Sequence, residues 1–153
     1  MENLSKNFPV SEFVYSAKAE ALGIDNAMPY WAYANARDLA ANVLQPLRDY
    51  LDASVSVSSG YRSPELNKEV NGEKSSQHLK GEAADIKTKR LREAFFYILQ
   101  HLEYDQLIWE YGTTKAPAWI HVSYRRGANR RQALRIYRDQ EGLKKTIAFD
   151  LKA

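Results

Sequence analysis

The stretch "DQLIWEYGTTKAPAWIHVSYR", which runs from Asp105 to Arg125, contains two segments rich in apolar and aromatic residues. Segments of this kind, about four to eight residues long and bounded by Gly, Pro or polar residues, are typical of β-strands. The connecting residues "TTKAP" give a loop of a length found in β-hairpins. We therefore predict two antiparallel strands of one sheet, at 105–112 and 118–125.

The second of these strands has two different faces. Because side chains alternate along a strand, His121 shares one face with Trp119 and Ser123. Ile120, Val122 and Tyr124 lie on the other face. The face with His121 is the more polar one. We expect it to line a cleft.

Helices and short strands flank the hairpin. An Ala- and Leu-rich amphipathic segment predicts a long helix at 30–51, which Pro46 should kink or split. Capping residues, alternation and turn residues predict further elements. They are a short helix capped by Ser11 that ends at Gly23, a strand at 53–60, a short helix opened by Ser63 and Pro64 that ends at Gly72, an irregular segment at 73–83, a strand at 84–88, and a helix at 89–102 capped by Thr88.

The C-terminal stretch "ALRIYRDQEGLKKTIAF" predicts another hairpin that turns at "DQEG", with a helix as the alternative. Helices mixed with short strands give an α+β fold: a small, largely antiparallel sheet with flanking helices. A chain of 153 residues has the length of one domain, so we predict a single domain over 1–153.

The composition is that of a folded protein, with 44% hydrophobic and 27% charged residues. The absence of cysteine excludes disulfides and thiolate metal sites, so any metal must use His, Asp, Glu or water. Basic residues gather at 125–153, with nine Lys or Arg against three acids. Such a segment suits an anionic polymer or is simply a solvated face. The sequence has no recognition helix or aromatic stacking pattern of a nucleic-acid-binding protein, so we expect no nucleic-acid partner.

The first residues, "MENLSKNFPVSEF", are polar and lack the apolar core of a signal peptide. No run approaches the ~18 apolar residues that a membrane-spanning helix needs. We therefore expect synthesis in the cytoplasm without a signal peptide, no membrane partner, and a monomer.

Three residues could form a metal site. His78 lies in the loop "SSQHLKGEAAD" (75–85), Asp85 begins a predicted strand, and His121 lies within another. Two imidazoles and one carboxylate are a ligand set typical of catalytic zinc, and they suit Zn²⁺ better than Ca²⁺ or Mg²⁺. The spacing of His78 and Asp85 also occurs by chance, so on spacing alone histidines without a metal are the simpler interpretation.

Small residues separate the first two candidate ligands. Gly81 would allow a backbone angle closed to other residues. Ala83 and Ala84 would let the chain pass close to the core and return Asp85 toward His78.

Several motifs resemble the zinc D-alanyl-D-alanine carboxypeptidase family. "SQHLKGEAAD" resembles its S-x-H-x-x-G-x-A-x-D signature, "SSGYRSPELN" the preceding S-G-Y-R-[ST] segment, and "WIHVSY" the strand with the third ligand. The opening residues are similar to a subgroup often encoded by phages or prophages. The resemblance covers about residues 4–131 and implies the DD-peptidase fold, which hedgehog-type proteins share.

The resemblance implies a role for each matching residue. His78, Asp85 and His121 would bind Zn²⁺. Arg62 would bind a carboxylate or carbonyl of a peptide substrate, which suits its forked donors. Ser76 would hydrogen-bond substrate, unless it only caps the loop.

The catalytic base departs from the family pattern. Many members have Glu three residues before the last His, where this chain has Ala118. If the two central strands pair, Glu110 comes close to His121, so we predict Glu110 as the general base. Glu82 is expected to face solvent.

The implied function is a zinc metallopeptidase acting on peptidoglycan stem peptides, foremost as a D-Ala-D-Ala carboxypeptidase. One alternative is an L-Ala-D-Glu endopeptidase of the endolysin type, which would reach the cell wall by phage-type lysis. Another is a zinc-containing binding module without catalysis, which the missing E-x-x-H glutamate keeps open.

Overall fold

The computed structural model describes residues 1–152, so the predicted domain end at Ala153 lies outside the described residues. The helical elements are α1 (Val10–Val14), α2 (Ala17–Leu22), α3 (Tyr30–Leu39), the π-helical segment η1 (Ala40–Leu44), α4 (Gln45–Leu51), α5 (Pro64–Glu69), the 3₁₀ turn η2 (Gln77–Lys80) and α6 (Leu91–His101). The strands are β1 (Ser56–Ser59), β2 (Ala83–Lys87), β3 (Gln106–Glu110), β4 (Trp119–Ser123), β5 (Gln132–Arg138) and β6 (Lys144–Ala148).

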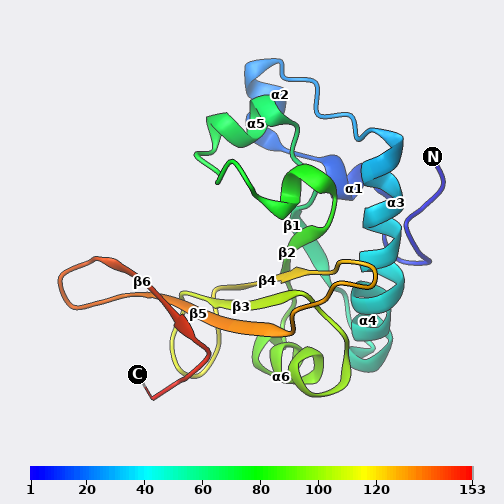
Figure 1. The fold of residues 1–153 in the computed structure, drawn as a ribbon. Helices are drawn as coiled ribbons and strands as arrows, with labels where there is room; N and C mark the ends of the chain where they lie inside the picture. The colour runs from blue at the N-terminus through cyan, green and yellow to red at the C-terminus, as the bar shows by residue number, and fades with distance from the viewer. Residues whose placement is uncertain (153) are drawn as a thin grey trace.

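The strands form one sheet in the order β1-β2-β4-β3-β5-β6 (Figure 1). Every neighbouring pair is antiparallel except β3 and β5, which run parallel. The predicted α+β fold with a small, largely antiparallel sheet and flanking helices is confirmed.

Both predicted hairpins are present. Strands β3 and β4 pair with Leu107 opposite Val122, and the connecting loop is closed by the Thr113 N–H donating to the Ala116 carbonyl at 2.9 Å. Strands β5 and β6 pair across the "DQEG" turn, where the Asp139 carboxylate accepts two backbone N–H groups. The helix considered for this segment is therefore wrong.

One face of the sheet packs on helices and forms the core. Its side chains Ile86, Leu107, Trp109, Ile120 and Val122 are fully buried, and α6 lies against this face (Figure 1). Burying a large apolar side chain contributes about 1.5–3 kcal/mol. Since strand side chains alternate, the residues between these point to the opposite, open face.

The predicted long helix is split, as expected, at Pro46. The proline has no N–H and its ring crowds the preceding turn, so the chain inserts η1 between α3 and α4. In this wider turn the Gln45 N–H donates to Ala40, five residues back. Leu39, Val43 and Leu44 remain buried through the junction.

Three local predictions are wrong. The first helix is divided, because the Ser16 hydroxyl accepts the Ala19 N–H and starts a second helix there. Thr88 does not cap α6, which begins three residues later without a side-chain cap. The segment at 73–83 is not wholly irregular, because the Ser76 hydroxyl accepts the His78 N–H and opens η2.

Helices α2 and α5 and the turn η2 stand above the open side of the sheet and are called the upper lobe (Figure 1). Below them, the hairpin of β5 and β6 extends away from the body. Among residues 1–152, no helix has the length and apolar character needed to cross a membrane.

Candidate metal centre

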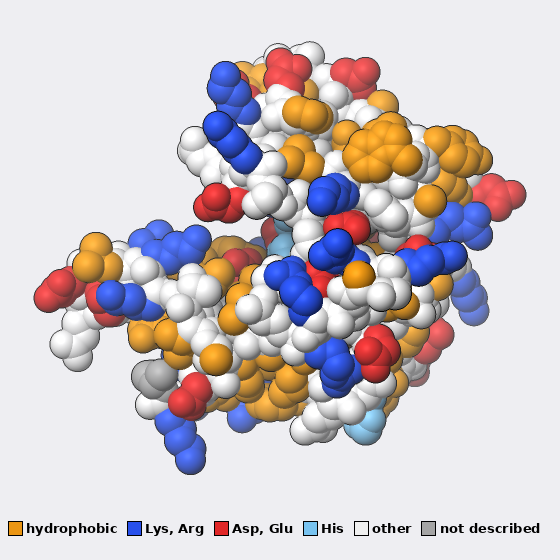
Figure 2. Space-filling model, viewed as in Figure 1, with side chains coloured by type: hydrophobic (Ala, Val, Ile, Leu, Met, Phe, Trp, Pro, Cys, Tyr) orange, Lys and Arg blue, Asp and Glu red, His pale blue; other side chains and the backbone are white. Residues whose placement is uncertain are grey.

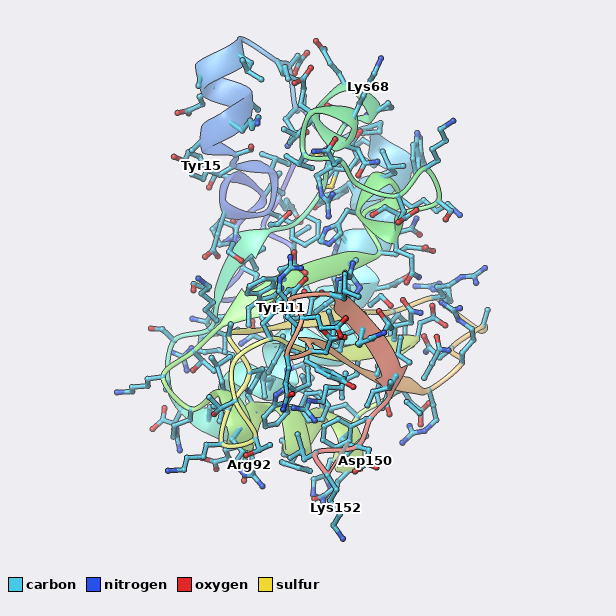
Figure 3. All side chains as sticks on the ribbon, turned by 90° about the vertical axis from the view of Figure 1, so that its left-hand side faces the viewer. Tyr15, Lys68, Arg92, Tyr111, Asp150 and Lys152 are labelled. Carbon is cyan, nitrogen blue, oxygen red and sulfur yellow. The ribbon has the colours of Figure 1, made fainter. Side chains whose placement is uncertain are left out.

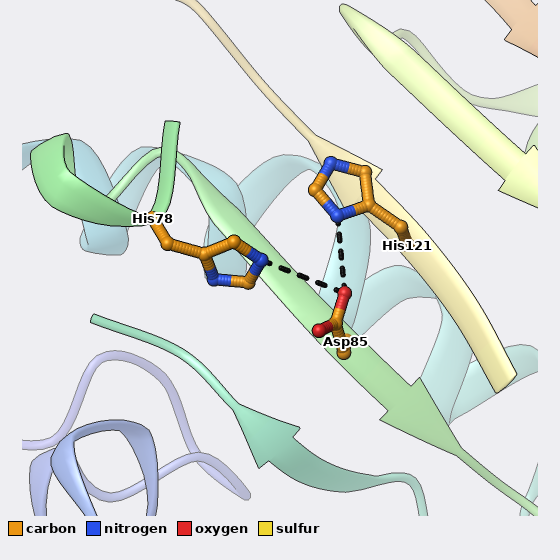
Figure 4. Close-up of side chains that lie close together, drawn as sticks. All are labelled: His78, Asp85 and His121. Carbon is orange, nitrogen blue, oxygen red and sulfur yellow. Dashed lines mark hydrogen bonds and ion pairs between the residues drawn. The ribbon is translucent and has the colours of Figure 1, made fainter. Parts of the chain in front are cut away.

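Three side chains from separate elements meet on the open face of the sheet (Figure 4). Asp85 of β2 lies opposite His121 of β4 in the antiparallel register, so both side chains point to the same face. His78 comes from η2 in the upper lobe and reaches the same point. The three residues offer ligand atoms that all lie within 4.8 Å of one another.

The Asp85 carboxylate is shared between the two imidazoles. Its Oδ1 atom lies 3.0 Å from Nδ1 of His121 and 3.5 Å from Nε2 of His78. The Nδ1 atom of His78 lies 2.7 Å from the Gly60 carbonyl, to which it donates, so Nε2 is left to face the centre. The ring is thereby held in one orientation.

Glycine and alanine make this convergence possible. Gly81 has φ +73°, and a Cβ there would lie 2.4 Å from the Ala32 carbonyl oxygen. A Cβ at Gly60 would lie 2.3 Å from the Phe13 carbonyl oxygen. Ala83 and Ala84 are fully buried, so larger side chains would have no room. The predicted roles of the small residues agree with this geometry.

Burial at His78 and hydrogen bonding at Asp85 favour the forms of these two groups that bind a metal. Burial lowers the pKa of His78, which favours the neutral imidazole. Burial acts to raise the pKa of Asp85, but hydrogen bonds with His121 and His78 outweigh it and hold that pKa well below its ordinary value. The carboxylate is therefore ionised at neutral pH.

The donor set fits Zn²⁺. Tetrahedral zinc with bonds of about 2.0–2.1 Å places its ligand atoms about 3.3 Å apart, close to the two separations at Asp85. Two imidazoles and one carboxylate leave a fourth position open, as catalytic zinc sites do.

All the predicted site residues line one cleft, with a volume of about 560 Å³, between the upper lobe and the sheet. They are Arg62, Ser76, His78, Asp85, Glu110 and His121. Figure 2 shows the hollow, with histidine atoms at its floor and charged side chains of both signs around it.

Arg62 is held beside the ligands. Its Nη1 atom donates to Asn67 Oδ1 at 2.9 Å, while its Nε is buried and has no hydrogen-bond partner among the described residues. A Cβ at Gly72 would lie 2.6 Å from Nη1, so the glycine leaves room for the guanidinium. Burial lowers the pKa of Arg62, and the charges of Asp85 and Glu110 oppose that shift.

Glu110 lies at the end of β3, directly opposite Trp119. The Trp119 indole N–H donates to Glu110 Oε2, and the Glu110 carbonyl accepts the N–H of Ala118. Ala118 occupies the position of the E-x-x-H glutamate, and its hydrogen bond places that position directly beside Glu110. Burial raises the pKa of Glu110, and the charge of Asp85 adds to this.

Two parts of the site escaped the sequence analysis. Glu82 does not face solvent, because it lines the cleft, accepts from Gln77 Nε2 at 3.3 Å and lies 4.0 Å from Arg125. The fully buried Asp105 accepts from Gln77 and forms a two-bond ion pair with Arg130. The only sequence signal for the part played by Arg125 and Arg130 was the excess of basic residues at 125–153.

A protein-family model described as Peptidase M15 matches residues 6–123, which is more than half of the chain. The chain belongs to the peptidase M15 family. This confirms the resemblance to zinc D-alanyl-D-alanine carboxypeptidases. All six predicted site residues lie within the matched region.

M15 peptidases depend on zinc and act on peptidoglycan, and the His-Asp-His group of this member could hold such an ion. Among curated proteins, no sequence matches the chain.

Proposed function

We propose that this M15 member is a zinc-dependent peptidase that hydrolyses peptidoglycan stem peptides, foremost as a D-Ala-D-Ala carboxypeptidase. The observation that carries the proposal is the single cleft that contains three metal ligands, an arginine and an acid. These are the parts that metal-assisted peptide hydrolysis requires.

The three ligands would hold zinc through His78, Asp85 and His121. When bound there, zinc supplies a Lewis acid and lowers the pKa of a coordinated water to about 7. The Gly60 carbonyl keeps His78 oriented throughout.

Arg62 would orient the substrate. Its partner-free Nε and its position in the cleft suit a carboxylate, such as the C-terminus of a stem peptide. Ser76 would have a smaller part, because its hydroxyl oxygen already accepts the His78 N–H but keeps its own proton to donate.

Glu110 would act as the general base. Trp119 holds one carboxylate oxygen, which fixes the orientation of the group. The other oxygen is free to take a proton from the attacking water and to pass it to the leaving amine. A carboxyl whose pKa is raised by burial accepts that proton more readily than an exposed one.

An endopeptidase is the second candidate, because a further cavity continues beyond the ligands. This cavity has a volume of about 260 Å³, and Arg62 and Asp85 line both it and the main cleft. A substrate could therefore extend on both sides of the centre, as cleavage at L-Ala-D-Glu requires. Mass spectrometry of digested sacculi separates the two, since one releases terminal D-Ala and the other whole stem peptides.

The route to the wall is part of the proposal. An enzyme of the endolysin type waits in the cytoplasm and reaches peptidoglycan through phage-type lysis. The basic side chains at the cleft, Arg125, Arg130 and Lys144, would favour contact with an anionic wall.

The test compares the purified wild type with His78→Ala. We expect about one zinc per wild-type chain and hydrolysis of muropeptides, with both lost in the variant. His101→Ala is the matched control, because His101 ends α6 and is not among the residues that line the cleft. Zinc-free wild type, or a fully active His78→Ala, would overturn the proposal.

A further inference from the structure

A second groove lies beside the metal cleft and has a volume of about 890 Å³. Its apolar lining comes from Trp31 at the start of α3, Tyr61, Pro64 and Leu79. The groove thus lies between α3, α5 and η2, along the outer side of the upper lobe.

The groove is continuous with the cleft. Asn71, Gly72 and Lys80 line both. Leu79 and Lys80 directly follow the metal ligand His78 in the chain. A molecule whose one end is cleaved at the metal centre could therefore rest its neighbouring part in this groove.

Trp31 is not part of the hydrophobic core. Its side chain is 59% exposed, whereas its neighbours Ala32 and Tyr33 are buried in the core. Tyr30 beside it is 74% exposed. Figure 2 shows hydrophobic side chains exposed on the upper part of the molecule, near the start of α3. A cluster of exposed aromatic rings commonly marks a binding surface.

The polar lining of the groove has one sign. Lys68, Lys74 and Lys80 line it, and no Asp or Glu does so among the described residues. Figure 3 shows Lys68 projecting outward from the upper lobe. The groove therefore offers an aromatic face and several hydrogen-bond donors, which suits a ligand with flat apolar surfaces and many acceptor oxygens.

We propose that this groove binds the glycan strand of peptidoglycan next to the stem peptide that the cleft receives. The inference rests on the proposed function. Sugar rings present flat C–H faces that can stack on Trp31, and their hydroxyl and N-acetyl oxygens can accept from the lysines. The concave shape of the groove favours an extended chain over a flat membrane surface.

The first experiment measures hydrolysis of two substrates that differ only in the sugar: a disaccharide-peptide and the free stem peptide. We expect Trp31→Ala to raise KM about tenfold on the disaccharide-peptide and to leave the free peptide unchanged. Trp31→Phe keeps a ring and should retain most of the affinity. Leu22→Ala is the control, because Leu22 is a similarly exposed apolar residue of α2 that does not line the groove.

A change of KM on both substrates, or on neither, would overturn the glycan site. If the wild type cleaves neither substrate, the proposed function is wrong, and the glycan site is then tested by binding of glycan oligomers alone. Peptide-free glycan oligomers should quench the fluorescence of the wild type but not that of Trp31→Phe. Absence of quenching, or binding to vesicles of anionic lipid in place of the glycan, would overturn it.

Discussion

The floor and the rim of the cleft are built in different ways. The floor consists of β2, β4 and η2, where Ala83 and Ala84 are fully buried and His78 is only 2% exposed. The rim consists of residues 125–130 and the hairpin of β5 and β6, and most of β6 is exposed. The floor is closely packed, whereas the rim combines an exposed hairpin with side-chain ion pairs such as Arg130–Asp105.

The family match follows the same division. It ends at residue 123, the last residue of β4, so it contains the floor and stops before the rim. Arg125, Arg130 and Lys144, which line the cleft, all lie beyond it. We infer that the floor carries the chemistry common to the family and that the rim adjusts how this chain attracts its substrate.

The largest effect is expected for Glu110, which lies at the end of β3 and lines the cleft beside the floor. Glu110→Gln keeps the shape of the side chain but cannot accept a proton, so kcat should fall by about 10²- to 10⁴-fold while zinc content stays unchanged. Glu82→Gln, the other acid of the cleft, should cost much less. A fully active Glu110→Gln would remove it as the base, and wild type without turnover but with zinc would favour the binding-module alternative.

Two glycines with left-handed backbone angles, Gly81 beside the floor and Gly142 in the rim, allow the packing of the two regions to be compared. At Gly81 an added Cβ would lie 2.4 Å from a carbonyl oxygen, but at Gly142 in the β5–β6 turn it would meet nothing within 4 Å. Gly142→Ala should lower the free energy of unfolding by about 1–2 kcal/mol from backbone strain alone. Gly81→Ala should cost about 3 kcal/mol or more and weaken zinc binding. Equal urea midpoints would contradict this account of the floor.

Asp105 ties the rim to the floor. Burial acts to raise its pKa, but the bonds from Arg130 outweigh this and hold the pKa below its ordinary value. Its ion pair should therefore stabilise the protein above about pH 4, with the contribution lost as the pH falls through the lowered folded-state pKa. Asp105→Asn should lose about 1.5–3 kcal/mol at pH 7, and the gap to the wild type should narrow toward pH 3.

The control for Asp105 is Glu103→Gln. Glu103 pairs with Arg131 at the surface, where the Arg131 side chain is 45% and the Glu103 side chain 66% exposed. Its loss should change stability by less than about 1 kcal/mol at any pH. A pH-independent gap for Asp105→Asn in urea titrations would show that its charge is not what matters.

The smallest effect is expected at the rim. Arg125→Ala should raise KM for an anionic stem peptide by about two- to fivefold at low salt, with kcat unchanged, since exposed charges act mainly on encounter. Salt should abolish the difference. Arg126→Ala is the matched neighbour, because Arg126 pairs with Asp38 and is not among the cleft residues. Equal effects at both arginines would show that only net charge matters.

Much of the fold could be predicted because local signals agreed with tertiary packing. The apolar and aromatic segments within 105–125 predicted both central strands, and alternation placed Ile120 and Val122 on the face opposite His121, which is the buried face. Pro46 marked the split in the long helix. Thr88 and Ser11 misled as caps, because the helices start where packing places them and other residues occupy the cap positions.

The candidate site could be predicted in its ligands but not in its supports. The signature identified His78 and Asp85, the strand "WIHVSY" identified His121, and the hairpin register accounts for Glu110. No local sequence pattern predicts the supporting contacts. Glu82 is held in the cleft by Gln77 of η2, and Asp105 bonds to Gln77 and Arg130, which lie 28 and 25 positions away in the chain.

A zinc-edge anomalous diffraction measurement on crystals of the zinc-loaded protein tests the central claim most directly. The account predicts one strong peak about 2.0–2.2 Å from Nε2 of His78, Oδ1 of Asp85 and Nδ1 of His121, with the Glu110 carboxylate within hydrogen-bond reach of the fourth ligand. A peak on other residues, or none at this triad, would contradict it.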